Sequence, residues 1–255
     1  SQGEILEIIN NILQSEFQID YKELEHHPKK HFIYFDDILA TGGTIFRDLK
    51  KWLDSEENGI QQSVSVLNKT KTLAISLFCY HQLGYSNIEW QLMKHTDDKL
   101  KRLLVVGSNY VIENHLKTKW IAEKQRLNCA YPIDDQPKEV FDYLNSLDAE
   151  NDSVPAFRNK NYPKEETFFS SPENRIRLEN LFLKKGIELL KKVKTENPDK
   201  RKRPLGDTVK SHKTLGVGTL FFTWRNISNT CPLVFWWDVP GHNWTPLFCL
   251  KYRGN

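Results

Sequence analysis

The chain of 255 residues has few cysteines and no long apolar run. Its four cysteines, Cys79, Cys129, Cys231 and Cys249, lie far apart and form no Cys-x-x-Cys pair. This spacing argues against a disulfide framework and a zinc site, and it favours reduced thiols in a cytosolic protein. Because the sequence has no signal peptide and no apolar run of about 18 residues, we expect a soluble, cytoplasmic protein that makes no membrane contact.

A strong excess of one charge is also absent, since 36 Lys and Arg face 33 Asp and Glu, for a net charge of +3. A balance this near to neutral neither requires nor excludes a nucleic-acid partner. The sequence shows no internal repeat and no low-complexity tract. Hydrophobic residues make up 39% of the chain and aromatic residues 12%, which excludes a disordered protein and predicts a sizeable core.

The first half of the chain alternates between strand and helix patterns. Apolar, β-prone runs predict strands at 32–35, 72–81 and 101–112, the last with a glycine break. Amphipathic spacing predicts helices at 4–13, 44–53 and 86–96, the last with Ser86 as its N-cap. This alternation favours an α/β fold with a parallel sheet over residues 30–112.

The second half is less regular. Helices are predicted at 138–147 and at 172–194, the latter capped by Ser171. The last segment, 218–249, alternates aromatic and turn residues and predicts β structure. We therefore divide the chain into a core at 1–115 and a helical and aromatic β extension at 116–255, which completes the same domain or a closely packed one.

The segment 32–46, FIYFDDILATGGTIF, does not fit an ordinary strand or helix. Asp36 and Asp37 end the apolar run, at the carboxyl edge of the predicted strand where open α/β sheets bind ligands. Two adjacent carboxylates can accept hydrogen bonds from a vicinal diol, directly or through Mg²⁺, which prefers oxygen ligands. Both acids are therefore candidate site residues, and indirect metal-binding residues.

The turn that follows suits an anion, and its residues are Ala40, Thr41, Gly42, Gly43 and Thr44. The two glycines permit positive φ angles and close backbone approach, and the two threonines add hydroxyl donors. The helix behind the turn directs its free N–H groups and its positive dipole end to the same point. Acids and turn together predict a ribose 5-phosphate site. The alternative is a plain glycine turn beside two solvated aspartates.

The fourteen residues FIYFDDILATGGTI resemble the phosphoribosyl diphosphate (PRPP) binding signature of type I phosphoribosyltransferases. The resemblance implies that Asp36 and Asp37 bind the ribose hydroxyls with Mg²⁺ close by, and that Ala40 to Thr44 hold the 5-phosphate. In catalysis the acids would position the sugar and stabilise an oxocarbenium-like transition state. The resemblance also implies a phosphoribosyltransferase-like core and an enzyme, either a pentosyl transferase or a nucleotide hydrolase.

The C-terminal segment 219–248 is similar to the Asn-rich tail of phosphoribosyltransferase-like proteins from bacterial conflict systems, some encoded beside a reverse transcriptase in retrons. The likeness rests on Asn226, Asn229, Thr230, Pro232 and Trp236, while Ser228 and Cys231 depart from the pattern. It implies a toxin-like effector of antiviral defence whose partners are a reverse transcriptase and its nucleic-acid product. The candidates for base or partner contact are Arg225, Asn226, Asn229 and Trp236. The alternative is that the aromatic residues pack as core.

One part of the family pattern is missing, because the residues before Phe32 contain no small-residue loop that could bind pyrophosphate. Three explanations stay open: an N-terminal part is lost, since the chain begins with Ser rather than Met; later basic residues such as Arg225 or Lys251 bind it; or the domain binds without turnover. The alternative functions are accordingly a housekeeping nucleobase phosphoribosyltransferase and a non-catalytic nucleotide-sensing or partner-binding module.

Three further patterns carry less information. The basic run over 184–203 could attract a nucleic-acid backbone, but a solvated helix face with a charged loop explains it better. Asp134 and Asp135 have no glycine turn behind them, so we interpret them as loop acids. His26 and His27 lack metal-ligand spacing and are interpreted as part of a surface turn.

Overall fold

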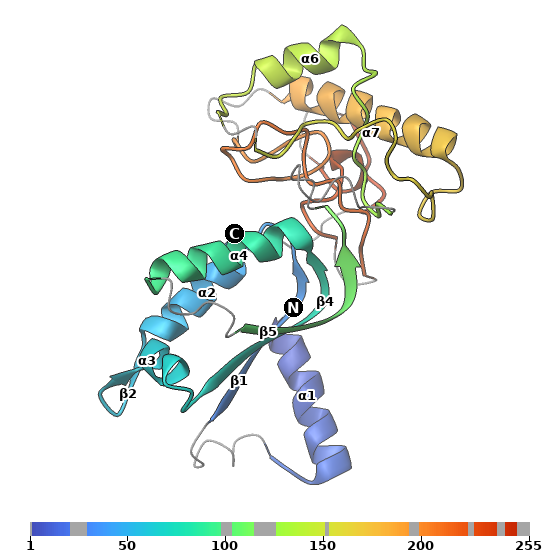
Figure 1. The fold of residues 1–255 in the computed structure, drawn as a ribbon. Coiled ribbons are helices and arrows are strands. Elements are labelled where there is room, and N and C mark those ends of the chain that lie inside the picture. Colours follow the sequence, from blue (N-terminus) through green and yellow to red (C-terminus); the bar gives the residue numbers. More distant parts are fainter. Residues whose placement is uncertain are drawn as a thin grey trace. The chain divides into compact units, whose positions relative to one another are not determined.

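The computed structural model describes residues 2–20, 30–97, 104–114, 126–150, 153–193, 199–223, 227–238 and 243–248. The chain divides into two compact units, residues 1–111 and residues 112–255. We call them unit 1 and unit 2. Unit 1 contains the α/β part, and unit 2 consists of helices and irregular segments (Figure 1). The sequence analysis places the division a few residues later, at 115/116.

Helices and strands alternate along unit 1. Its elements are α1 (Gln2–Phe17), β1 (His31–Leu39), α2 (Gly43–Asp54), β2 (Glu56–Glu57), β3 (Ile60–Gln61), α3 (Gln62–Leu67), β4 (Thr72–His81), α4 (Gln82–His95) and β5 (Leu104–Ile112). The long strands form a parallel sheet in the order β1-β4-β5. Strands β2 and β3 pair as a small antiparallel hairpin. The predicted α/β fold class is therefore confirmed.

Strand β4 occupies the centre of the sheet, and its buried residues alternate with more exposed ones. Leu73, Ile75, Leu77 and Cys79 are buried, and the residues between them are more exposed. Successive side chains of a strand point to opposite faces, so this pattern gives the sheet one fully covered face. Paired residues of parallel strands share a face, so Phe32, Tyr34 and Asp36 of β1 lie on the same face as Leu73, Ile75 and Leu77 of β4.

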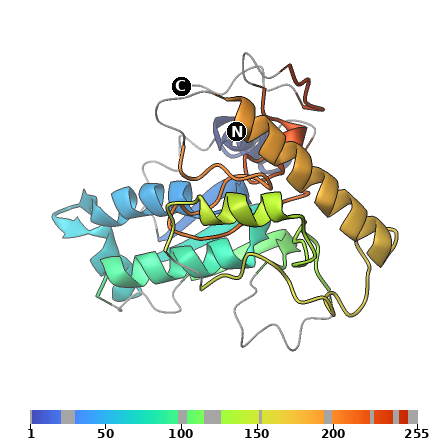
Figure 2. The ribbon, with the colours of Figure 1, turned by 90° about the horizontal axis from the view of Figure 1, so that it is seen from above.

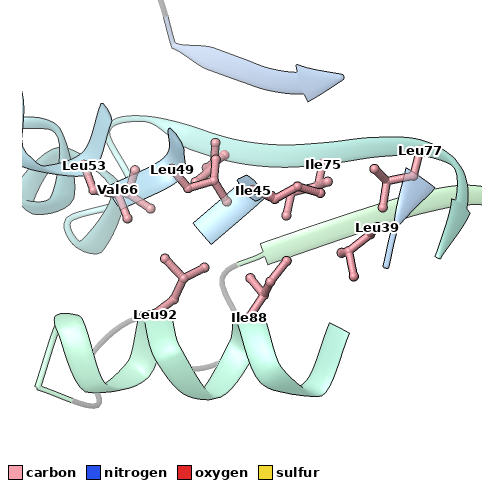
Figure 3. Close-up of a cluster of buried hydrophobic side chains, with 10 residues drawn as sticks. Leu39, Ile45, Leu49, Leu53, Val66, Ile75, Leu77, Ile88 and Leu92 are labelled. Atoms are coloured by element: carbon pink, nitrogen blue, oxygen red, sulfur yellow. The ribbon is translucent and has the colours of Figure 1, made fainter. Parts of the chain in front are cut away.

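The covered face of the sheet packs against α2, α3 and α4, with α2 and α4 side by side (Figure 1, Figure 2). In Figure 3, Ile88 and Leu92 of α4 point towards Ile45 and Leu49 of α2 and towards β4, and all four side chains are at most 2% exposed. Burial of each such side chain is worth roughly 1.5–3 kcal/mol relative to exposure. This core therefore fixes the carboxyl ends of β1 and β4 relative to the N-termini of α2 and α4.

Three details of unit 1 differ from the predictions. Strand β1 does not end at the two acids, because its backbone continues to pair with β4 as far as Leu39. Ser86 is not an N-cap, since α4 begins at Gln82 with His81 in the cap position. Gly107 does not break β5, which runs through it. The helix predicted at 4–13 is found and is longer, as α1, which contacts β1.

Unit 2 contains α6 (Lys138–Asn145) and α7 (Pro172–Lys192). Val140 and Leu144 of α6 pack against Leu183 and Ile187 of α7. The predicted cap of α7 is confirmed, because the Ser171 hydroxyl accepts the N–H of the third helical residue at 3.2 Å. The helix predicted at 138–147 is confirmed as α6.

The β structure predicted for 218–249 is not found in the described residues of that segment. They form one isolated antiparallel bridge, Phe222–Ile227, and the short 3₁₀ helix η2 (Leu233–Phe235). The backbone leaves a strand path at Gly218, whose φ is +69°, and Gly206 and Gly216 in the chain just before the segment also have positive φ angles, +99° and +126°. A β-carbon on any of them would collide with the backbone of another segment. A pleated strand cannot pass through such positions.

The composition also gave expectations about the cysteines, about metal binding and about membrane contact. Cys79, Cys129 and Cys231 are free, buried thiols, as predicted. Within the described ranges no cluster of three or more His, Cys, Asp or Glu could bind a metal ion. Among the helices of those ranges, none combines the length and the apolarity needed to cross a bilayer.

Candidate ribose-phosphate site

Asp36 lies inside β1, close to the strand's carboxyl end. It pairs with Leu77, which is 3% exposed, so its carboxyl group lies on the helix-covered face of the sheet. Burial there raises the pKa of Asp36 to about 7, and a hydrogen bond with the side chain of Asp37 adds to the rise. At neutral pH a large share of Asp36 is therefore protonated, and the two acids hold less than two full negative charges.

The backbone orients both carboxylates. Oδ1 of Asp36 accepts the N–H of Asp37 at 2.9 Å, and Oδ1 of Asp37 accepts the N–H of Ile38 at 2.9 Å. A cation near the two acids would offset their mutual repulsion, which is one cause of the raised pKa of Asp36. The pair thus fits Mg²⁺, which is usually held by one or two carboxylates and keeps water or ligand oxygens elsewhere.

Gly42 is the last residue of the turn and the N-cap of α2. It is buried, its φ is +87°, and its carbonyl accepts the N–H of Phe46 at 2.9 Å. As the N-cap residue it offers no side-chain acceptor, and α2 has no acidic residue in its first turn. The first N–H groups of α2 and the positive end of its dipole therefore face the turn, which is the arrangement that binds an anion.

Only one of the two adjacent glycines needs the conformational freedom of glycine. Gly43 is the first residue of α2 and its φ is not positive, so of the two glycines that permit a positive φ only Gly42 adopts one. Nothing lies within 4 Å of a β-carbon placed there. Gly43 and Thr44 are exposed, while Ala40 and Thr41 are half-buried. Of the five predicted turn residues, Ala40, Thr41 and Gly42 thus precede α2, and Gly43 and Thr44 are its first two residues.

The first turn of α4 also lies against this site, which the sequence analysis missed. A β-carbon on Gly84 would be 1.8 Å from the carbonyl oxygen of Ala40. His81, the N-cap of α4, directly follows Tyr80, which pairs with Leu39. Its ring is buried, and burial lowers its pKa to about 3, so it is neutral. The available signal was the parallel sheet itself, which brings the carboxyl ends of neighbouring strands to one edge.

In the C-terminal segment, Trp236 lies in a buried cluster of unit 2. It is 5% exposed, and its indole N–H donates to the carbonyl of Cys231 at 2.8 Å. This placement favours the packing alternative over base contact. Arg225 and Asn226 lie outside the described residues. Contact of these residues with a base or partner remains a prediction.

Replacing Trp236 with Phe is expected to destabilise unit 2 by about 1–3 kcal/mol, because it removes one buried hydrogen bond and part of a buried ring. This change is measured by denaturant unfolding, with hydrogen exchange of the α7 amides as the probe of unit 2. Unaltered exchange together with weaker nucleotide binding would instead support a ligand role for the indole.

Asn229 donates a hydrogen bond to a buried acid, Asp207, which the sequence analysis did not single out. Its side-chain amide donates to Oδ2 of Asp207 at 2.9 Å, and Nζ of Lys202 lies 3.3 Å from Oδ1 of Asp207. Burial raises the pKa of Asp207, and Lys202 opposes that rise. The signal for Asp207 was weak, because Pro-Leu-Gly-Asp is an ordinary turn sequence.

The remaining patterns are the basic run over 184–203, the acids Asp134 and Asp135, and the pair His26 and His27. Several cations of the basic run pair with carboxylates, namely Lys185 with Glu188, Lys191 with Glu139, Lys200 with Asp148, and Arg201 with Asp199. Asp134 and Asp135 are exposed, and Asp134 lies 3.5 Å from Lys160. His26 and His27 lie outside the described residues.

A parallel sheet that leads through an acid pair and a glycine turn into a helix N-terminus defines a phosphoribosyltransferase-like domain. The family model PRTase-CE matches residues 1–249, and the chain belongs to this family. The match spans both compact units. Comparisons with curated proteins and with solved structures found no match.

Proposed function

We propose that unit 1 binds the ribose 5-phosphate part of PRPP or of a nucleotide and promotes transfer or hydrolysis at the anomeric carbon, with Mg²⁺. One observation carries the proposal: the left-handed Gly42 turn and the open N-terminus of α2 follow the half-buried Asp36 within a few residues. An acid that could accept hydroxyl hydrogen bonds and a turn that suits a phosphate thus follow one another closely along the chain.

The chemistry follows from the two ends of this site. The bond from the anomeric carbon to the leaving group breaks, and its electron pair departs with the oxygen of pyrophosphate or with the nitrogen of a base. A base nitrogen or a water oxygen then forms the new bond and loses a proton. Asp36 and Asp37 orient the hydroxyls, and their negative charge stabilises the developing oxocarbenium charge. Bound Mg²⁺ would be held by the two acids and by ligand oxygens, and it would offset the negative charge of the phosphates.

The proposal extends to a cellular role through the likeness of the C-terminal segment. We place the protein as an effector of a retron-type antiviral system that acts on nucleotides, with a reverse transcriptase and its nucleic-acid product as partners. This step is an analogy and rests on no site geometry. A housekeeping nucleobase phosphoribosyltransferase and a catalytically silent nucleotide sensor are the competing functions.

Nucleotide analysis separates these functions. Nucleotides are measured by mass spectrometry in cells that express the wild type, the variant Asp36→Asn/Asp37→Asn, or the control Asp134→Asn/Asp135→Asn, which alters an exposed acid pair of unit 2. Nucleotides that change with the wild type and the control, but not with the site variant, support an effector enzyme. A silent wild type that binds PRPP supports the sensor.

Binding of ribose 5-phosphate with Mg²⁺ is expected to tighten as the pH rises from 6 to 8. Because the pKa of Asp36 is raised to about 7, the carboxyl is mostly protonated below that pH and ionised above it. Only the ionised form binds Mg²⁺ and accepts two hydroxyl hydrogen bonds, so affinity gains up to about tenfold per pH unit below the pKa. Calorimetry across this range measures the slope.

The ligand's own phosphate also titrates, with a second pKa near 6. The Asp36→Asn variant keeps that ligand titration and loses the titration of the acid, so the difference between the two slopes belongs to Asp36. Equal slopes for the two proteins would contradict this assignment.

A further inference from the structure

The first turn of α4 touches the 40–44 turn at a point that has no room for a side chain. A β-carbon on Gly84 would lie 1.8 Å from the Ala40 oxygen, 2.9 Å from the Ala40 carbonyl carbon and 2.7 Å from Leu39 Cδ2. Two of these three atoms belong to backbone, which cannot move aside as a flexible side chain can. The close approach therefore exists only because residue 84 is glycine.

The contact is reciprocal. A β-carbon on Gly42 would lie 2.6 Å from Ile88 Cγ1 and 2.9 Å from the carbonyl oxygen of Gly84. Gly42 and Gly84 thus face each other, one on the turn and the other on the helix. The surface of α4 determines the path of the backbone at 40–42.

Helix α4 cannot retreat to accept a larger residue. Ile88 is 0% and Leu92 is 1% exposed, and both pack in the core between the sheet and α2 (Figure 3). Protein interiors are close-packed, so a shift of α4 would disrupt that core. A methyl group at position 84 is therefore accommodated by displacing Ala40 and the turn that follows it.

We propose that Gly84 is a positioning residue for the phosphate cup, although it lies outside the binding motif and touches no ligand. This inference rests on the proposed function. By holding the 40–42 backbone against α4, Gly84 keeps the turn aligned with the N–H groups of α2. The class of ligand it serves is a phosphate monoester or inorganic phosphate.

The test is Gly84→Ala in the full chain, with inorganic phosphate and ribose 5-phosphate as probes, followed by ³¹P NMR and calorimetry. We expect both ligands to bind at least tenfold more weakly, by a similar factor, because both use the cup. Asp36→Asn should instead weaken only ribose 5-phosphate. Because partial unfolding of unit 1 would also weaken both ligands equally, hydrogen exchange of β4 amides is measured alongside, and the weakening must exceed the loss of folded protein.

Two control variants match the substitution. Gly186 lies on α7, and a methyl there would lie 2.7 Å from backbone atoms of Pro204. Gly186→Ala therefore introduces the same kind of clash in unit 2. Gly107→Ala adds a methyl in open space within unit 1. Phosphate affinity should stay within twofold of wild type in both. Since alanine is the better helix former, propensity alone would favour Gly84→Ala.

The possible outcomes separate the two claims. If the wild type binds neither ligand, the proposed function fails and the inference fails with it. If the wild type binds and folded Gly84→Ala binds equally well, only the inference fails. Should Gly84→Ala not fold, Ile88→Val tests the same contact, because it removes a methyl that supports Gly42. It should raise hydrogen exchange at 41–44 and weaken phosphate binding about threefold, and unchanged binding would overturn the proposal.

Discussion

Replacing Asp36 with Asn is expected to weaken binding of ribose 5-phosphate about 100-fold, since two hydrogen bonds from hydroxyls to a charged acceptor are lost. The same change is expected to stabilise unit 1 above pH 7 by about 1–2 kcal/mol, after allowance for partial exposure. A gain in stability with a loss of binding is the signature of a site residue, because structural acids behave in the opposite way.

The sign follows from the direction of the shift. Burial raises the folded-state pKa of Asp36 from 3.8 to about 7. Its contribution to stability is therefore fully present below the unfolded-state pKa and is lost as the pH rises through about 7. The variant has no such loss, so its advantage should be near zero at pH 4 and complete by pH 8. Hydrogen exchange of β4 amides reports unit 1 separately.

Asp54 provides the matched control. Hydrogen bonds from Lys50 and His95 lower its pKa, so Asp54 stabilises unit 1 at neutral pH and loses that effect as the pH falls. At pH values above 5, Asp54→Asn should therefore cause a small loss of stability in unit 1, and it should leave the affinity for ribose 5-phosphate unchanged. If Asp36→Asn also destabilised unit 1 at pH 8, the assignment of Asp36 as a strained site acid would be wrong.

The acid pair and the turn could be predicted from the sequence because their arrangement is local. Asp36, Gly42 and the start of α2 are separated by only a few residues, and their relation is decided by a strand, a tight turn and a helix N-terminus. The same locality explains why α7 and its Ser171 cap were predicted correctly. The hydrogen bonds that shape the turn and the cap join residues a few positions apart, namely Phe46 N–H to the Gly42 carbonyl and Asn174 N–H to the Ser171 hydroxyl.

Gly84 and His81 could not be found in this way, because their role depends on register. They reach the site through the pairing of Leu39 with Tyr80 and through the packing of Ile88 under the turn. A sequence pattern shows that residues 72–81 form a strand, but it does not show which residue of that strand lies beside Ala40.

The C-terminal segment was misassigned for a related reason. Alternating aromatic and turn residues favour a strand, yet its backbone groups bond to distant segments: Gly218 N–H donates to the Leu205 carbonyl at 2.8 Å, and the Gly218 carbonyl accepts the N–H of Ala130 at 2.7 Å. Glycines with positive φ make these crossings possible. Nothing in the local pattern indicates them, since each partner lies in another part of the fold.

Replacing Gly42 with Ala is expected to reduce binding of phosphate and ribose 5-phosphate about 100-fold, and to destabilise unit 1 by about 1–3 kcal/mol. The φ of +87° is strained for any residue with a β-carbon, and the added methyl would lie 2.6 Å from Ile88 Cγ1. The turn can relieve both problems only by unwinding, which rotates the first N–H groups of α2 away from the anion.

The neighbouring variant Gly43→Ala makes the comparison strict, because it adds the same methyl one residue later. Gly43 has an ordinary φ and open space around it, so stability should stay level or rise slightly with the better helix former. Its effect on phosphate binding should be less than about tenfold, as the methyl narrows the cup but leaves the N–H groups in place. Calorimetry with inorganic phosphate and thermal unfolding measure both variants. If Gly43→Ala weakened binding as much as Gly42→Ala, direct crowding of the ligand would be the cause, and the left-handed turn would not be what forms the site.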